Sequence, residues 1–215
     1  MIFKFTRGDT VKKSQIVLTQ YSPFLSVDTP LVAVDGNSVA IPRVCSLCRC
    51  GESKYKPMCD GSHSAVGFVW TREDSDKAEP EHYVGKDITI VFDRYLCMGN
   101  GACGELEAVF GTRKEPKYEP DAASADEIIA IIKKCPSGAL SYILDGKHIR
   151  FFFDRPQVVV EQNGPLHVQG EVNLIDDQDS DKLIPVGDHY TLCRCGGSKK
   201  KPLCDGSHEE NGFEG

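Results

Sequence analysis

The sequence predicts an α+β fold in three parts, in which two small β-rich units flank a different, helix-containing domain. Three observations support this prediction. A pattern of three cysteines and one histidine occurs twice, and each matched position is offset by 145 residues. Short β-branched and apolar runs precede both copies, which is typical of short strands. The stretch between the copies instead contains a helix-capping pattern and its own cysteines.

Both β-rich units are predicted from apolar runs separated by turn residues. A polar, charged stretch at residues 71–81 is predicted to be a linker, so we expect units at residues 1–80, 81–148 and 149–215. The predicted strands are residues 16–18, 31–34 and 39–41 in the first unit and residues 158–160, 166–168, 172–175 and 190–192 in the last. Each cysteine loop is therefore expected to extend from a small β unit.

The middle unit is expected to contain strands and two helices. Ser124 and Glu127 form a capping box before a segment with one apolar side, which predicts a helix over residues 125–134. Pro136 follows and is expected to end that helix. The other expected elements are a strand at residues 87–93, a cysteine loop at 97–103, a short helix near 105–110, and strands at 141–144 and 148–153.

Composition and charge argue against several classes of function. The chain of 215 residues has a formal net charge of −7, which disfavours binding to a nucleic-acid backbone. No apolar run approaches the roughly 20 residues that cross a bilayer, and the N-terminal segment lacks the features of a secretory signal. We therefore predict a cytoplasmic protein that binds neither nucleic acid nor membrane.

The ten cysteines are expected to serve as metal ligands rather than disulfides, because a reducing compartment keeps them as thiols. Nine of them fall into three clusters with ligand-like spacing. Cys45 stands apart, and Tyr190 replaces it in the second copy, so we predict that Cys45 is a thiol without a ligand role.

The repeated pattern is a set of metal ligands. The first copy reads Cys48-x-Cys50-x2-Ser53-x3-Pro57-x-Cys59-Asp60-Gly61-Ser62-His63, and the second reads Cys193-x-Cys195-x2-Ser198-x3-Pro202-x-Cys204-Asp205-Gly206-Ser207-His208. The first two sulfurs of each copy can reach one iron, and the later cysteine and histidine can share a second. Three cysteines and a histidine also satisfy tetrahedral zinc, although zinc ribbons usually begin with Cys-x2-Cys.

Both stretches resemble the CDGSH iron–sulfur domain, whose pattern they match at every defined position. The resemblance implies one [2Fe-2S] cluster per motif, held by Cys48, Cys50, Cys59 and His63 in the first and by Cys193, Cys195, Cys204 and His208 in the second. It also implies that two motifs associate through swapped strands. Because both motifs lie on one chain, we expect an intramolecular pseudo-dimer and a monomeric protein. One neutral imidazole leaves the cluster less negative, so its reduction potential should exceed that of an all-cysteine cluster.

The cysteines of the middle unit form a third candidate ligand set, Cys97-x5-Cys103 followed later by Cys135-Pro136. Residues 81–146 resemble the divergent single-cluster ferredoxins, which share this spacing and the ending Cys-Pro-Ser-Gly-Ala-Leu. Three thiolates suit a [3Fe-4S] cluster, or a [4Fe-4S] cluster whose fourth iron has another ligand. Asn100 stands where bacterial ferredoxins have a middle cysteine, which leaves the fourth ligand open. The alternative is three buried cysteines without a cluster.

The predicted function is one-electron transfer between redox protein partners through several iron–sulfur centres. No nucleotide-binding glycine pattern, nucleophile elbow or paired-carboxylate pattern is present, so we expect no enzymatic substrate site. The alternative is cluster storage, cluster transfer to apo iron–sulfur acceptors, or redox and pH sensing through histidine-gated cluster release. Lys54, Lys56 and the lysines at residues 199–201 are either solvated surface charges or a docking site for an acidic partner.

Overall fold

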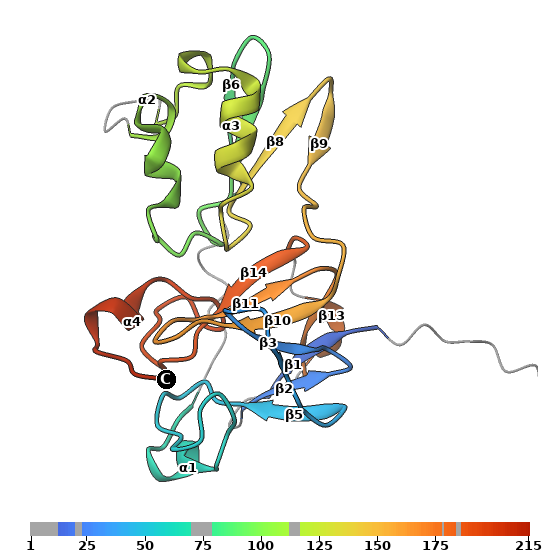
Figure 1. The fold of residues 1–215 in the computed structure, drawn as a ribbon, viewed down its shortest axis with the longest axis vertical. Helices are drawn as coiled ribbons and strands as arrows, with labels where there is room; N and C mark the ends of the chain where they lie inside the picture. The colour runs from blue at the N-terminus through green and yellow to red at the C-terminus, as the bar shows by residue number, and fades with distance from the viewer. Residues whose placement is uncertain (1–12, 20–22, 70–78, 112–116, 178, 184–185) are drawn as a thin grey trace, which may run out of the picture.

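The computed structural model describes residues 13–19, 23–69, 79–111, 117–177, 179–183 and 186–215 (Figure 1). The described chain is β-rich with few helices, and its strands form three sheets. None of the described helices is long and apolar enough to cross a membrane. The N-terminal segment and most of the linker predicted at residues 71–81 lie outside the described residues.

The two ends of the chain form matching sets of short elements. The first set is β1 (Gln15–Leu18), β2 (Phe24–Val27), β3 (Leu31–Ala33), β4 (Ser38–Val39), β5 (Val44–Leu47) and α1 (Ser62–Ala65). The last set is β10 (Gln157–Val160), β11 (Leu166–Gln169), β12 (Asn173–Asp176), β13 (Asp179–Leu183), β14 (His189–Leu192) and α4 (Ser207–Glu210). Buried and more exposed residues alternate along β1, β11 and β12, as expected of strands with one face on a core.

The two ends of the chain share both of their sheets. One sheet has the strand order β13-β12-β1-β2-β5, and the other has the order β14-β11-β10-β3-β4. β1 pairs in parallel with β12, which places Ile16 opposite Leu174, and β3 pairs in parallel with β10. Each end of the chain therefore contributes a hairpin, β3–β4 or β12–β13, to the sheet built around the other end (Figure 1).

The middle of the chain forms a separate antiparallel sheet with short helices beside it (Figure 1). Its strands, in the order β6-β7-β8-β9, are β6 (Glu81–Val84), β7 (Thr89–Phe92), β8 (Leu140–Leu144) and β9 (Lys147–Ile149). Its helices are a 3-10 turn at Ala102–Leu106, α2 (Glu107–Phe110), a 3-10 turn at Pro120–Ala122 and α3 (Ala125–Ile132). The predicted capping box is present, since Ser124 and Glu127 satisfy each other's backbone N–H groups. α3 packs on β8 and buries Ile128, Ile131 and Ile132.

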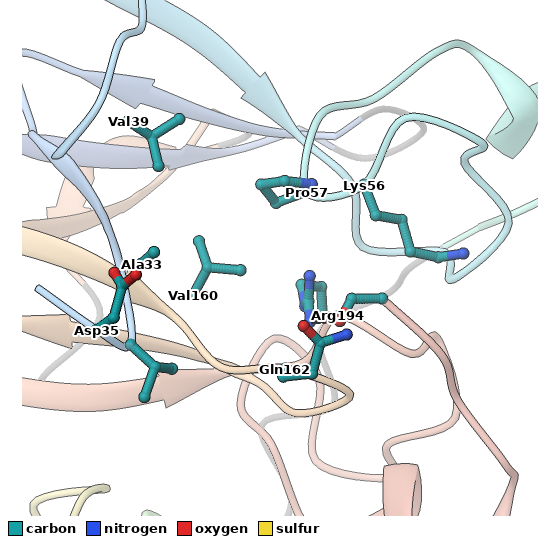
Figure 2. Close-up of a pocket in the computed structure, with 10 residues that line it drawn as sticks. Ala33, Asp35, Val39, Lys56, Pro57, Val160, Gln162 and Arg194 are labelled. Atoms are coloured by element: carbon teal, nitrogen blue, oxygen red, sulfur yellow. Dashed lines mark hydrogen bonds between the residues drawn. The ribbon is translucent and has the colours of Figure 1, made fainter. Parts of the chain in front are cut away.

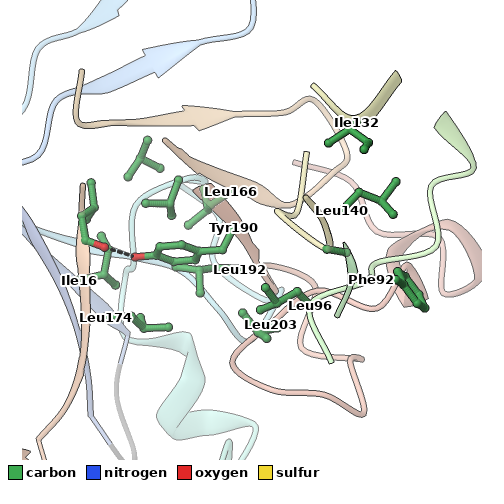
Figure 3. Close-up of a cluster of buried hydrophobic side chains, with 14 of the residues drawn as sticks. Ile16, Phe92, Leu96, Ile132, Leu140, Leu166, Leu174, Tyr190, Leu192 and Leu203 are labelled. Atoms are coloured by element: carbon green, nitrogen blue, oxygen red, sulfur yellow. Dashed lines mark hydrogen bonds between the residues drawn. The ribbon is translucent and has the colours of Figure 1, made fainter. Parts of the chain in front are cut away.

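One hydrophobic cluster runs through all three sheets (Figure 3). It includes Ile16 of β1, Leu174 of β12 and Tyr190 of β14, whose hydroxyl donates to the Val172 carbonyl at 3.0 Å. Leu96, which follows β7, and Leu203, in the second cysteine loop, belong to the same cluster. The middle sheet is thus packed against the C-terminal end of the chain rather than tethered loosely to it.

Several predicted elements differ from the structure. The strand predicted at residues 148–153 ends at Ile149, because the backbone N–H groups of Phe152 and Phe153 donate to the Asp188 carboxylate instead of to a neighbouring strand. The helix predicted near residues 105–110 begins as a 3-10 turn at Ala102. Strands β2, β5, β6 and β13 were not predicted from the sequence.

We predict that Leu174→Ala destabilises the whole chain, because this buried side chain lies where the hairpin from one end joins the sheet of the other. The expected loss in the free energy of unfolding is about 2–5 kcal/mol, measured by urea denaturation. Val84→Ala is the matched control, since Val84 is 78% exposed in β6 and should change stability by less than about 0.5 kcal/mol. An unchanged midpoint for Leu174→Ala would contradict the shared core.

Candidate metal centres

The predicted ligands of the first loop lie in two close pairs. Cys48 and Cys50 follow β5 and are almost fully buried, and their Sγ atoms are 3.8 Å apart. Cys59 and His63 lie across the next turn, with the Cys59 Sγ atom 3.2 Å from His63 Nδ1. The loop closes through two backbone bonds, from Cys48 N to Pro57 O at 2.8 Å and from Cys59 N to Ser46 O at 2.9 Å.

The second loop repeats this geometry at every matched position. The Sγ atoms of Cys193 and Cys195 are 3.8 Å apart, and Cys204 Sγ lies 3.4 Å from His208 Nδ1. The matching backbone bonds run from Cys193 N to Pro202 O at 2.9 Å and from Cys204 N to Thr191 O at 3.0 Å. The same sequence pattern therefore folds into the same loop twice.

An aspartate holds each turn that carries the histidine. Asp60 accepts hydrogen bonds from the Ser62 hydroxyl at 2.6 Å, from Lys54 N at 2.9 Å and from Ser62 N at 3.0 Å. These donors keep the pKa of the Asp60 carboxyl well below its usual range. Gly61 follows with φ +90°, a conformation that favours glycine, and its N–H donates to Cys59 Sγ at 3.4 Å. The Asp-Gly pair thus turns the chain and directs an amide at a ligand sulfur.

The pairing of donors fits a binuclear cluster better than a single ion. A tetrahedral zinc ion needs all four ligands around one point. A [2Fe-2S] cluster instead needs two ligands on each of two irons, which is how both loops arrange their donors.

Burial disfavours ionisation of some of these thiols, although the hydrogen bond with Cys193 lowers the pKa of Cys195 to about 5. Desolvation raises the pKa of Cys204 to about 11, and it also raises the pKa of Cys59. Thiols with such pKa values stay protonated at neutral pH unless a metal displaces the proton. Loading of these sites with iron is therefore expected to release protons.

Two buried arginines lie near the candidate ligands of both cysteine loops. Arg49 lies between Cys48 and Cys50, and Arg194 lies at the matching position, with 4% and 1% of their surfaces exposed. Burial lowers the pKa of Arg49 to about 10, and negative charge at Asp177, then at Cys193 of the opposite loop, Asp176 and Cys50 of its own loop, would act against that shift. Burial also lowers the pKa of Arg194, which negative charge at Cys48 of the opposite loop, at Glu161 and at Cys195 of its own loop would oppose. Each arginine therefore places its positive charge near candidate ligands of both loops, with a cysteine of the opposite loop having the larger effect.

The hydrogen bonds of Arg194 anchor it within the C-terminal end of the chain. Its Nε and Nη2 atoms donate to the carbonyls of Gly164, Glu161 and Gly215, and its guanidinium lies 5.0 Å from the centre of the Phe213 ring. Within the described chain, its buried Nη1 atom has no hydrogen-bond partner. A buried cation with an unsatisfied donor favours a negatively charged group nearby, which an iron–sulfur cluster with thiolate ligands supplies.

A cavity of about 400 Å³ lies between the two ends of the chain beside this arginine (Figure 2). Lys56 and Pro57 of the first loop and Arg194 of the second line it, together with Ala33 of β3 and Val160 of β10. The arginine of the second loop thus reaches the first loop, in agreement with its interaction with Cys48. Arg49 and Arg194 were not among the predicted site residues, although arginine stands at the same place in both copies of the pattern.

The three cysteines of the middle domain line one cavity of about 250 Å³. Cys97 and Cys103 come from the loop after β7, and Cys135 follows α3. The remaining lining is largely apolar, with Phe92, Met98, Phe110, Tyr118 and Leu140 among its members. Burial and the charges of Cys97 and Cys135 raise the pKa of Cys103, which shows that the three sulfurs influence one another. The cavity is a suitable cradle for a cluster.

The position of a fourth ligand in the middle domain is not filled by a cysteine. Asn100, which stands at that position, is exposed, and its Oδ1 accepts from Ala102 N at 3.3 Å within its own loop. Ser137 is buried and lines the cavity, with its hydroxyl 3.6 Å from Cys135 Sγ. Cys45 lies in β5 opposite Ser26 and within the hydrophobic core.

Comparison with known proteins identifies the domains. Residues 24–64 and 163–209 match the family model described as iron-binding zinc finger, CDGSH type. The chain belongs to the CDGSH iron–sulfur family. Residues 83–145 of this CDGSH protein match a second model, described as a divergent 4Fe-4S mono-cluster. It is therefore an iron–sulfur protein in which a divergent 4Fe-4S domain is inserted between two CDGSH regions.

Two curated relatives of this CDGSH protein are similar over a shorter stretch. Both are described as uncharacterized protein YjdI, from Escherichia coli strain K12 and from Escherichia coli O157:H7. Each is 33% identical over 64 residues, which cover 28% of this chain and 80% of the relative. No solved structure matches the chain.

We predict that Arg194→Gln lowers the reduction potential of the centre in the first loop more than that of the centre in the second. Removal of a buried positive charge near Cys48 disfavours addition of an electron there, by roughly 50–100 mV or about 1–2 kcal/mol. Arg49→Gln should do the reverse, because its charge lies near Cys193.

Redox titration followed by electron paramagnetic resonance (EPR) measures both shifts, and iron content verifies that each variant is loaded. Lys54→Gln is the control, since this exposed charge is screened by solvent and should have little effect. A larger change in the reduction potential of the centre in the arginine's own loop would contradict this prediction.

Proposed function

We propose that this chain transfers electrons one at a time between redox protein partners. It would use two [2Fe-2S] clusters, each held by three cysteines and one histidine, and a third cluster in the middle domain. The two CDGSH units would act as an intramolecular pseudo-dimer around an inserted ferredoxin-like α+β domain, with units at residues 1–80, 81–148 and 149–215. The chain's residues would hold the clusters, tune their potentials and exclude water.

The observation that carries this proposal is the direct contact between the two ligand loops. Cys50 and Cys195 form an antiparallel backbone bridge. A side chain at Gly51 would lie 2.6 Å from the Cys195 carbonyl oxygen, and one at Gly196 would lie 2.5 Å from the Cys50 carbonyl oxygen. Only glycine permits this approach, so the two candidate clusters lie on either side of one tight backbone contact. Closely spaced one-electron centres suit electron transfer.

The middle cluster is proposed to be of the [4Fe-4S] type, in line with the family model that matches this domain. Its ligands would be Cys97, Cys103 and Cys135, which line one cavity. The fourth iron would lack a cysteine, and its loss would leave a [3Fe-4S] cluster held by the same three residues.

We also propose that the protein works in the cytoplasm as a monomer, without binding nucleic acid. Reduced thiols are needed to bind the clusters, and the cytoplasm keeps thiols reduced. The exchange of hairpins within one chain supplies the strand partners that a second copy would otherwise provide.

Cluster storage, delivery or sensing is the competing function, and one experiment separates it from electron transfer. The loaded protein is first assayed for iron and acid-labile sulfide, with about four irons per chain expected from two [2Fe-2S] clusters and about seven or eight if the middle site is filled. It is then reduced, reoxidised and mixed with an apo-ferredoxin. We expect reversible reduction without loss of iron and no transfer of clusters. Transfer of intact clusters to the apo-ferredoxin would contradict the electron-carrier function.

We predict that His63→Cys lowers the potential of the first-loop centre by roughly 100 mV, because a thiolate adds negative charge to the cluster. His208→Cys should do the same for the second-loop centre. EPR-monitored redox titration measures both, and the unaltered loop in each variant serves as the internal control. An unchanged or raised potential of the altered centre would refute the assignment of these histidines as cluster ligands.

A further inference from the structure

The middle domain contacts the two CDGSH loops unequally. Lys200 of the second loop donates from Nζ to the carbonyls of Arg94 at 3.0 Å and of Cys97 at 3.3 Å. Cys97 is one of the candidate ligands of the middle centre. At the position in the first loop that matches Lys200, Tyr55 is 73% exposed.

The glycine of the histidine-bearing turn shows the same difference. A Cβ atom added at Gly206 would lie 2.8 Å from the Met98 carbonyl oxygen, so the turn packs directly on the loop between Cys97 and Cys103. A Cβ atom added at the matching Gly61 would have no atom within 4 Å. The two glycines have nearly identical φ values of +89° and +90°, so only their surroundings differ.

A third contact joins β14 to Cys135, another candidate ligand of the middle centre. His189 Nε2 lies 3.0 Å from the Cys135 carbonyl oxygen, and its Nδ1 lies 2.6 Å from Asp188 Oδ1. Asp188 and His189 are each 1% exposed, and the rings of Phe152 and Phe153 lie beside the His189 imidazole. At the position matching His189, Val44 is 50% exposed.

The burial of the loops follows from these contacts. Leu203 and Cys204 of the second loop are 1% and 2% exposed, whereas the matching Met58 and Cys59 of the first loop are only half-buried. Figure 1 shows the middle sheet next to β14 and the second loop, with α1 of the first loop at the other end of the molecule. The second loop therefore lies between the middle domain and the first loop.

From this arrangement, and resting on the proposed electron-transfer function, we propose that the three centres form a chain in a fixed order. The middle centre exchanges electrons with the second-loop centre, and that centre exchanges them with the first-loop centre across the Cys50–Cys195 contact. Each step oxidises one centre and reduces its neighbour by one electron. The second-loop centre is internal, and it does not exchange directly with protein partners.

Both ends of this chain of centres have exposed residues next to their candidate ligands. Gly99, Asn100 and Gly101 are exposed in the loop of the middle centre, and Asp60 and Gly61 are exposed in the first loop. A one-electron protein donor docks at one end and a one-electron protein acceptor at the other. Lys200 and His189 are positioning residues, since they hold the ligand loops of two neighbouring centres together without binding either cluster.

The order is tested by EPR on the loaded full-length protein, in which the spin of one reduced centre speeds the relaxation of its neighbour. His63→Cys and His208→Cys alter the signals of the first and second loops separately and so assign them. We expect reduction of the middle centre to speed relaxation of the second-loop signal much more than that of the first-loop signal. Equal effects on both signals, or a larger effect on the first-loop signal, would overturn the order.

Matched variants test the contacts that set the order. Gly206→Ala pushes a methyl group against the Met98 carbonyl, whereas Gly61→Ala has the same backbone strain and no neighbour. We expect the relaxation effect of the middle centre on the second-loop signal to weaken in Gly206→Ala and to persist in Gly61→Ala. Lys200→Tyr, which copies the first loop, should also weaken it, and Tyr55→Lys should leave it unchanged. If Gly206→Ala and Gly61→Ala had the same relaxation effect, and Lys200→Tyr and Tyr55→Lys also had the same effect, the assigned contacts would be contradicted.

A readout without redox chemistry accompanies these variants. Hydrogen exchange of the backbone amides at residues 97–103 should speed up in Lys200→Tyr and stay unchanged in Tyr55→Lys, because only Lys200 bonds to that loop. Failure of the order is distinguishable from failure of the proposed function. Delivery of clusters to apo-ferredoxin would contradict the electron-transfer function. A loaded, reversibly reduced protein with a different coupling pattern would contradict only the proposed order of the three centres.

Discussion

Two parallel strand pairings hold the ends of this chain together, and the positions of all three candidate centres depend on them. β1 lies beside β12 and β3 lies beside β10, so neither end of the chain completes a five-stranded sheet by itself. Parallel neighbours require a long connection between them. The chain from β3 to β10 provides one, and a whole domain fits within it. The insertion of the middle domain is thus compatible with the pairing that brings the two ligand loops together.

The exchange of strands also explains why two arginines are buried where a small protein has little room for charge. Arg49 and Arg194 each precede a cysteine of the Cys50–Cys195 contact, and each lies near candidate ligands of both loops. A buried cation is costly without a nearby negative charge. The cluster of one loop would therefore offset the burial of the other loop's arginine.

The ligand loops were predictable from the sequence because their residues act locally. Fixed spacing places two cysteines on one short turn, and Asp60 and Gly61 set the next turn through their own side-chain and backbone preferences. The capping box of α3 was predictable for the same reason. β13 was not, because its polar sequence forms a strand only by pairing with β12. Residues 151–153 were misassigned because their apolar pattern favours a strand, while Asp188, far along the chain, takes the backbone donors of Phe152 and Phe153.

The middle domain docks on only one of the two matching ends of the chain, because the chain contains a single inserted domain. β5 and β14 are corresponding edge strands of the two shared sheets, but one inserted domain can cover only one of them. β14 is covered, and all four of its residues are buried, including His189 and Tyr190. β5 is not covered in this way, and Val44 remains half exposed. The differences between the two copies at Val44 and His189, and at Tyr55 and Lys200, therefore fall where the environments differ, while the ligand positions stay the same. A repeated motif with a single insertion therefore leaves one of its two cysteine loops beside the inserted domain and the other away from it.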